Sequence, residues 1–133
     1  MGRVADGMGR VPVNTANLRG IEALPVSVEI SLSGGIPGLT IVGMPDGAVL
    51  EARSRIRCAI ASCGFEIPRL HVTVNLAPAD MKKSGTAFDL PIAAAILCAT
   101  GQVPHERLDG TLLFGELALD GSVRSHMRFW HAN

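Results

Sequence analysis

The sequence is short of aromatic residues and of net charge, and each shortage excludes a class of protein. Tyr is absent and aromatic residues make up 4% of the 133 residues, so we do not expect a protein that stacks single-stranded bases on exposed rings. Lys and Arg together number 12, and so do Asp and Glu. A formal net charge of zero gives no general attraction for DNA or RNA, which leaves only a local basic patch as a means of binding them.

Long apolar runs and paired cysteines are also lacking. The stretch Leu90–His105 is interrupted by Thr100, Gly101 and two prolines, which leaves about ten apolar residues in a row, too few to span a bilayer. The three cysteines form no CxxC pair, and the four histidines are not at ligand spacing with them, so no metal site is predicted. An odd, sparse set of cysteines without a signal peptide predicts a cytoplasmic protein that keeps its thiols reduced and has no membrane partner.

Nucleotide and nucleophile motifs do not occur either. No window matches the phosphate loop GxxxxGK[ST]; Lys83–Ser84 has its last two residues but not the glycines before them. The segment GGIPG at residues 34–38 does not match GxGxxG and precedes no helix. Ser84 next to Lys83 suggests a Ser/Lys nucleophile by adjacency alone, and a flexible loop before a helix explains the same residues. No catalytic, cofactor-binding or metal-binding residue is therefore assigned, and no cofactor is expected in this chain.

What is present is one domain of alternating strands and helices. We expect a loose leader with at most a short strand over residues 1–17, a domain over 18–124, and an atypical tail over 125–133 that holds the single Trp. The tail either docks on the domain or is foreign to it. Apolar and polar residues alternate over 26–32 and again over 71–76, which predicts two half-buried strands. The segment 39–42 is predicted to return antiparallel to the first strand after a Gly-rich turn.

Two helices and a hairpin complete the predicted elements. A helix is expected from Gly47 to Cys63 with Asp46 as its N-cap, since apolar residues recur there at helical spacing. A second, apolar on all sides, is expected over 90–100 with Asp89 as its N-cap and forms the centre of the core. A strand over 112–119 then leads into an Asp-Gly turn at 120–121 and a short return strand.

Five cations are the candidate contacts for an anion, DNA or a protein partner. Lys82 and Lys83 are the only lysines and precede the start of a helix, where anions are favoured. Arg53 and Arg57 lie four residues apart on one helix face, and Arg69 follows that helix. Solvated charges that keep a loop and a helix face soluble are the alternative interpretation.

Three separated stretches resemble a known family. They are GIEALPVSVEISLSGGIPGLTIVGMPDGAVLEARSRIRCAI, TVNLAPADMKKSGTAFDLPIAAAIL and LLFGELALDGSVR. Together they closely resemble the N-terminal domain of the magnesium-chelatase-like AAA+ ATPases, the YifB or ComM competence group, over about residues 18–124. Family members continue beyond Ser125 into a further segment and helix, so the resemblance implies that the 18–124 domain is truncated. The resemblance implies an α/β (α+β) fold like domain 2 of ribosomal protein S5, shared with the Lon proteolytic domain. In that fold a mixed sheet has helices on one face and a left-handed βαβ crossover, against the usual hand.

The resemblance also implies what the rest of such a protein does. Family members carry a C-terminal AAA+ module that binds ATP and Mg, assemble as homo-oligomeric rings, and in competence members drive DNA branch migration. This chain is then a non-catalytic accessory domain for ring assembly or for contact with DNA or protein. A Lon-like Ser/Lys peptidase is the alternative, but alignment with the Lon motif places Ala87 where the serine is expected.

Overall fold

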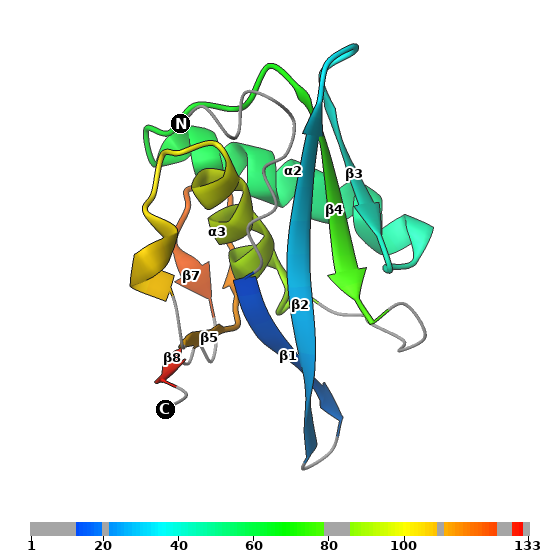
Figure 1. Cartoon of the computed structure of the whole chain (residues 1–133), viewed down its shortest axis with the longest axis vertical. Helices are drawn as coiled ribbons and strands as arrows, with labels where there is room; N and C mark the ends of the chain where they lie inside the picture. Colours follow the sequence, from blue (N-terminus) through cyan, green and yellow to red (C-terminus); the bar gives the residue numbers. More distant parts are fainter. Residues whose placement is uncertain (1–12, 20–21, 79–85, 109–110, 125–128, 132–133) are drawn as a thin grey trace.

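The fold is a mixed β-sheet with two helices, described in the computed structural model for residues 13–19, 22–78, 86–108, 111–124 and 129–131 (Figure 1). In the described part, the larger sheet has six strands in the order β3-β4-β2-β1-β5-β8. These are β1 Val13–Arg19, β2 Glu22–Ser33, β3 Gly38–Val42, β4 His71–Ala77, β5 Thr111–Leu113 and β8 Phe129–His131. The helices are α2 Asp46–Ser62 and α3 Asp89–Ala99, with a 3₁₀ turn at His105–Leu108 and a small sheet of β6 Glu116–Leu117 and β7 Val123–Arg124.

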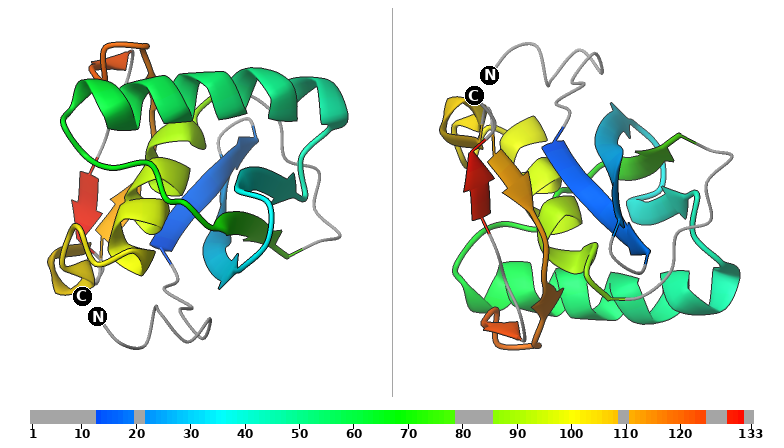
Figure 2. Two further views of the ribbon diagram at one scale, coloured as in Figure 1. Left: turned by 90° about the horizontal axis from the view of Figure 1, so that it is seen from above. Right: turned by 90° about the horizontal axis from the view of Figure 1, so that it is seen from below.

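The alternating patterns bury one face of the sheet, as predicted. Within β2 the alternating residues Val26, Val28, Ile30 and Leu32 are all buried, while the polar residues between them are not. β4 repeats this pattern with Val72, Val74 and Leu76. Both described helices lie on this apolar side of the sheet (Figure 2). The mixed sheet with helices on one face is therefore present, and the chain is of the α+β class.

The neighbour predicted for β3 is wrong. β3 pairs in parallel with β4, and β4 pairs antiparallel with β2, so β4 lies between the two strands that were expected to form a hairpin. β3 does run opposite to β2, as the short Gly-rich connection requires. The chain leaves β3, passes through α2 and returns as β4, which makes β3–α2–β4 a parallel crossover unit.

The two ends of the domain differ from the expected boundaries. β1 pairs with β2 along its whole length, and its Thr15 is fully buried and donates a hydrogen bond to the carbonyl of Leu113 in β5. The sheet therefore begins at Val13 rather than near Leu18; residues 1–12 lie outside the described residues. In the tail, Phe129–His131 pairs antiparallel with β5, which agrees with docking. The rest of the tail, residues 125–128 and 132–133, lies outside the description.

The strand predicted over 112–119 is split in two. Thr111–Leu113 belongs to the larger sheet, whereas Glu116–Leu117 forms a hairpin with β7. The break is at Gly115, which is buried and has a φ of 151°, in the region that favours glycine. The Asp120–Gly121 turn is confirmed: an Asp120 carboxylate oxygen accepts hydrogen bonds from both the amide and the hydroxyl of Ser122.

The helices begin one residue earlier than expected, and both predicted N-caps are wrong. Pro45 is the N-cap residue of α2 and Phe88 that of α3, and neither has a side-chain oxygen to accept a capping hydrogen bond. Asp46 and Asp89 are instead the first residues inside their helices. Within the described residues, neither helix has the length and apolarity needed to cross a membrane.

Candidate functional site

A buried ion pair joins the two helices. Arg55 of α2 donates two hydrogen bonds to Asp89 of α3, from Nε to Oδ2 at 2.6 Å and from Nη2 to Oδ1 at 3.1 Å. The backbone amide of Leu117 donates a third to Oδ2 at 3.2 Å. The Asp89 side chain is 1% exposed and that of Arg55 is 19% exposed. The planar guanidinium matches both oxygens of the carboxylate, which makes this a strong and directional contact.

The residues around Arg55 and Asp89 explain why these two charged side chains lie at the core. Arg55 lies beside Ile56 and between Ala52 and Ala59, all three of which are buried, so its stem starts at the border of the buried face of α2. Asp89 opens a helix with eight buried residues out of eleven. An acid at this place has no route to solvent and needs a cation from a neighbouring element.

Burial and pairing act in opposite directions on the acid. Burial raises the pKa of Asp89 above the ordinary 3.8 of this carboxyl, while the hydrogen bonds from Arg55 and the Leu117 amide act to lower it. On the other side of the pair, the hydrogen bond to Asp89 raises the pKa of Arg55, which remains charged at any physiological pH. Burial therefore has the largest effect on the pKa of Asp89, and the ion pair with Arg55 reduces the cost of burying the carboxylate.

The ion pair is part of a wider junction at the start of α3. The Gly115 amide donates to the Ala87 carbonyl at 2.8 Å, and the Leu90 amide donates to the Gly115 carbonyl at 2.9 Å. Beside them the Thr86 hydroxyl donates to the Glu116 carboxylate at 3.1 Å. The segment from Gly115 to Leu117 is therefore fixed to the start of α3 by backbone and side-chain bonds at once, which makes this a rigid joint of the fold.

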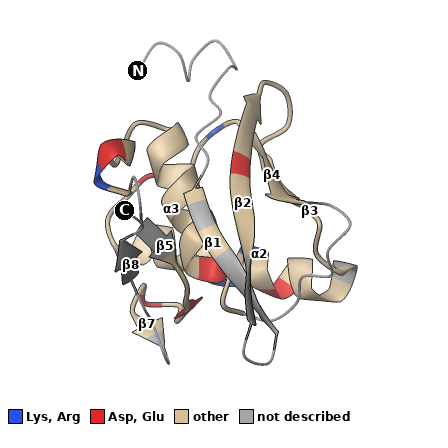
Figure 3. Ribbon diagram, turned by 60° about the horizontal axis from the view of Figure 1, so that its bottom comes forward, with Lys and Arg blue, Asp and Glu red and all other residues tan. Residues whose placement is uncertain are grey.

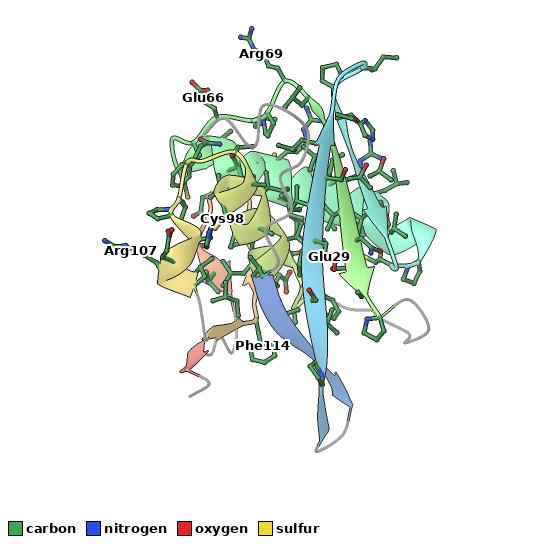
Figure 4. The ribbon with its side chains drawn as sticks, in the orientation of Figure 1. Glu29, Glu66, Arg69, Cys98, Arg107 and Phe114 are labelled. Atoms are coloured by element: carbon green, nitrogen blue, oxygen red, sulfur yellow. The ribbon has the colours of Figure 1, made fainter. Side chains whose placement is uncertain are left out.

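The five candidate cations are only partly placed by the structure. Lys82 and Lys83 lie outside the described residues. Arg53 is half-buried on α2, whereas Arg57 on α2 and Arg69 in the α2–β4 connection are exposed. Figure 4 shows the Arg69 side chain pointing away from the protein, near Glu66. Arg53, Arg57 and Arg69 make no ion pair with any other described residue, so each is available for a contact.

Two hollows border Arg57 and Arg69 and share Ile67 and Pro68. The first is apolar, lies under the start of β3 and β4 between the two helices and the α2–β4 connection, and has a volume of ≈ 40 Å³. That is far below the roughly 300–1,000 Å³ of a small-molecule site. The second is wide and polar and runs along residues 66–70 to Thr100 and Gln102.

The side chain of Gln102, which lines the second hollow, bonds to the backbone of Glu66. The side-chain nitrogen Nε2 of Gln102 donates to the backbone carbonyl of Glu66 at 2.9 Å. Its side-chain oxygen Oε1 accepts from the backbone amide of Glu66 at 2.8 Å. Gln102 thus takes the place of a strand neighbour and ties the α2–β4 connection to the end of α3. This tie positions the segment that carries Arg69.

Sequence reasoning missed the ion pair. Glu51, one turn away on the same helix, is the acid that local spacing would pair with Arg55, but that contact is a long 3.9 Å and Glu51 is exposed. A usable signal was present, because Asp89 stands alone in an apolar segment and an unpaired acid is costly in a core. Among the described residues, no group of three or more His, Cys, Asp or Glu could hold a metal ion.

Comparison with known proteins places the chain in a family. Residues 28–131 match the family described as subunit ChlI of Mg-chelatase. The chain is 49% identical over 112 residues to YifB of Escherichia coli (strain K12), covering 84% of this chain and 22% of that protein. It is 46% identical over 105 residues to the competence protein ComM of Haemophilus influenzae (strain Rd), covering 79% of this chain and 21% of that protein.

The matched part is a small share of these relatives. The chain spans about a fifth of the length of the curated relatives that it matches. The ChlI match continues through residue 131 and so includes β8, in the segment that the sequence set apart as a tail. Since the match covers most of the chain and the relatives agree with it, this chain belongs to the ChlI family of Mg-chelatase subunits, in the group that contains YifB and ComM.

Proposed function

We propose that this chain is the non-catalytic N-terminal accessory domain of a magnesium-chelatase-like AAA+ ATPase of the competence type. Its role is ring assembly or contact with DNA or protein. The observation that carries the proposal is the 46% identity to a competence protein over a matched region that is 21% of that protein's length. ATP and Mg belong to the AAA+ module that is its first partner, and the whole protein forms a homo-oligomer in the cytoplasm. The fold is then that of domain 2 of ribosomal protein S5, with a left-handed β3–α2–β4 crossover.

The described charges support an accessory role. Asp89 accepts hydrogen bonds from Arg55 and from the Leu117 amide. These contacts give this buried acid a structural role rather than a catalytic one. Arg57 and Arg69 are exposed and Arg53 is half-buried, and none pairs with a described acid, so these arginines suit a contact with DNA phosphates or with acidic side chains of a partner. Lys82 and Lys83 would add to that charge.

The first experiment measures ATP hydrolysis. The purified chain is expected to hydrolyse no ATP, whereas the full-length relative ComM is expected to hydrolyse it. ComM that lacks the residues aligned with this chain should keep its hydrolysis but lose assembly, measured by sedimentation, or DNA binding, measured by fluorescence anisotropy. Turnover by the isolated chain after purification controls, or a truncated ComM unchanged in both assays, would refute the proposal.

The second experiment locates DNA contact. If the domain itself touches DNA, replacing Lys82, Lys83 and Arg69 by Gln should weaken binding and lower its dependence on salt, since each phosphate contact contributes to that slope. A casein digestion with a Ser84→Ala control tests the peptidase alternative. Digestion by the original chain that the Ser84→Ala variant lacks would favour a peptidase over an accessory domain.

A further inference from the structure

The apolar hollow under β3 and β4 reaches the surface. Its rim, which we call the mouth, has three exposed residues from three segments: Pro37 of the β2–β3 turn, Arg57 of α2 and Ile67 of the α2–β4 connection. Its floor consists of buried side chains from both helices and both strands, namely Leu39, Ile56, Ile60, Val72 and Ile96. Because exposed and buried residues line the same hollow, it extends from the surface into the core.

Side-chain hydrogen bonds hold both connections at the mouth, which lie at the same end of the molecule (Figure 1). His71 at the start of β4 donates from Nδ1 to the carbonyl of Ile36 at 3.3 Å, and its Nε2 hydrogen-bonds with the Thr40 hydroxyl at 2.9 Å. In the α2–β4 connection, the Gln102 side chain makes its two hydrogen bonds to the backbone of Glu66. A mouth with fixed sides costs less conformational entropy to occupy than a mobile one.

The hollow has the size of one small aliphatic side chain. Its volume of ≈ 40 Å³ has room for more than one water molecule but is far below that of a small-molecule site. The floor is apolar, so a group that enters must be apolar as well. Ile36, next to Pro37 in the chain, is 86% exposed and Ile67 is 37% exposed, so apolar surface continues outside the hollow. This favours a side chain of a protein partner over a free ligand.

The charge at the mouth is positive. Arg57 is exposed and makes no ion pair with the other described residues. No acid lines this hollow, and Glu66 lines only the second hollow, where Arg69 accompanies it. The strands above the hollow, β3 and β4, contain no Lys, Arg, Asp or Glu (Figure 3). A carboxylate of a partner would therefore meet a favourable potential beside Arg57.

We propose that the mouth binds an acidic segment of a partner protein, with one aliphatic side chain inserted into the hollow and a neighbouring carboxylate paired with Arg57. Burial of the aliphatic side chain provides the affinity, and the arginine selects acidic segments over basic ones. This inference deepens the protein-contact role proposed above and rests on it. The test below needs no ATPase module, so its failure leaves the assembly and hydrolysis experiments unaffected.

The test titrates the 133-residue chain, labelled with ¹³C at the isoleucine δ1 methyl groups, with synthetic peptides. The probe is the blocked peptide Ala-Glu-Val-Glu-Ala. One control peptide has Lys in place of both Glu residues, and another has Asn in place of Val. The probe should shift the methyl signals of the four isoleucines that line the hollow, which are Ile56, Ile60, Ile67 and Ile96, and leave that of Ile92 unchanged. Both control peptides should bind about tenfold more weakly or not at all.

Matched variants separate the mouth from the rest of the surface. Arg57→Glu should weaken binding of the probe about tenfold or more and reverse the preference, so that the Lys peptide binds more tightly. Arg107→Glu makes the same charge change at an exposed arginine of the 3₁₀ turn, which lines neither hollow. Because solvent and salt screen distant charges, it should change binding less than about twofold.

A second pair of variants tests the apolar part of the mouth. Ile67→Ser removes an aliphatic group from the rim and should weaken binding about threefold or more. Leu50→Ser is the control, because Leu50 is 64% exposed on α2 and lines neither hollow.

Three outcomes would overturn the proposal. The first is the absence of methyl shifts when the probe is added to the original chain. The second is equal weakening by Arg57→Glu and Arg107→Glu, since binding would then depend on overall charge and not on the mouth. The third is a dimer of the chain in sedimentation that Ile67→Ser converts to monomer, because a second copy would then occupy the mouth. Circular dichroism spectra confirm that each variant folds.

Discussion

Helices α2 and α3 pack on the same face of the sheet, yet they differ in what they expose. Eight of the eleven residues of α3 are buried, including its single charge, Asp89. α2 buries Ala52, Ile56, Ala59 and Ile60, while its other described residues, which include most of its charged side chains, are half-buried or exposed. The difference shows that α3 is a core element whose one charge must be neutralised from outside, while α2 supplies that cation and still presents others to a partner.

The largest loss of stability is expected when the Arg55–Asp89 ion pair is broken by replacing the arginine. Arg55→Met leaves the Asp89 carboxylate, 1% exposed, without its cation. Removing one partner of a buried pair should lower the free energy of unfolding by about 3–5 kcal/mol. Urea unfolding followed by circular dichroism measures it.

The control for that variant is on the same helix. Arg57→Met removes an arginine that is exposed and unpaired among the described residues, and should cost less than about 0.5 kcal/mol. The double variant Arg55→Met with Asp89→Leu should recover much of the loss, because it removes both charges. If Arg55→Met alone were as stable as the original chain, Asp89 would not depend on Arg55.

Core packing of α3 gives the next effect. Ile92 is fully buried, so Ile92→Ala should cost about 2–5 kcal/mol through lost contacts and a residual cavity. Leu50 of α2 is 64% exposed, and Leu50→Ala should change stability by less than about 0.5 kcal/mol. The same urea assay compares them, and equal losses at the two positions would contradict the division between the helices.

The acid itself should give a smaller loss with a characteristic pH dependence. Asp89→Asn keeps an acceptor for the Leu117 amide but leaves Arg55 without its anion. The free energy of unfolding should fall by about 1–3 kcal/mol. Because the folded-state pKa of Asp89 is raised, the folded protein holds this proton more tightly than the unfolded chain. The contribution of Asp89 to stability therefore falls as pH rises from the ordinary 3.8 through the raised value.

Unfolding measured across this pH window tests that sign. The stability of the original chain relative to Asp89→Asn should decrease as pH rises through the window and then become constant. A relative stability that instead increases with pH would mean that pairing with Arg55 outweighs desolvation and lowers the pKa of Asp89.

The smallest effect on stability is expected at Arg53, which is half-buried, and Arg69, which is exposed. Arg53→Gln and Arg69→Gln should each change the free energy of unfolding by less than about 0.5 kcal/mol, since neither makes an ion pair within the described part of the chain. Thermal unfolding is a sufficient measurement. A loss above 1 kcal/mol at either position would place that arginine among the structural residues, together with Arg55.

Elements that depend on local patterns could be predicted from the sequence. Alternation identified the central part of β2 and nearly all of β4, and helical spacing placed α2 and α3 to within one residue at each end. These patterns record which side chains face the core, and that is a property of a few neighbouring residues. The neighbour of β3 and the strand β1 were not predictable in this way, since both depend on pairing between distant segments.

The candidate site was less accessible to sequence reasoning, for a related reason. Asp89 looked like a helix cap because Asp often is one, but its partner Arg55 lies 34 positions away and meets it only once the two helices pack together. Arg53, Arg57 and Arg69 can be listed as cations from the sequence, but the hollow beside Arg57 is built from β3, β4, both helices and a connecting loop. No spacing in the sequence encodes that arrangement.

The Gln102 tie also gives the domain a built-in reporter of motion. Because the Glu66 amide bonds to a side chain rather than to a strand, its hydrogen exchange depends on one rotamer of Gln102 and not on unfolding of the sheet. If a partner pulls on the α2–β4 connection, the Glu66 amide should exchange faster while the β2 and β4 amides remain protected. Exchange of the Glu66 amide proton would therefore report a displacement of the α2–β4 connection before the sheet unfolds.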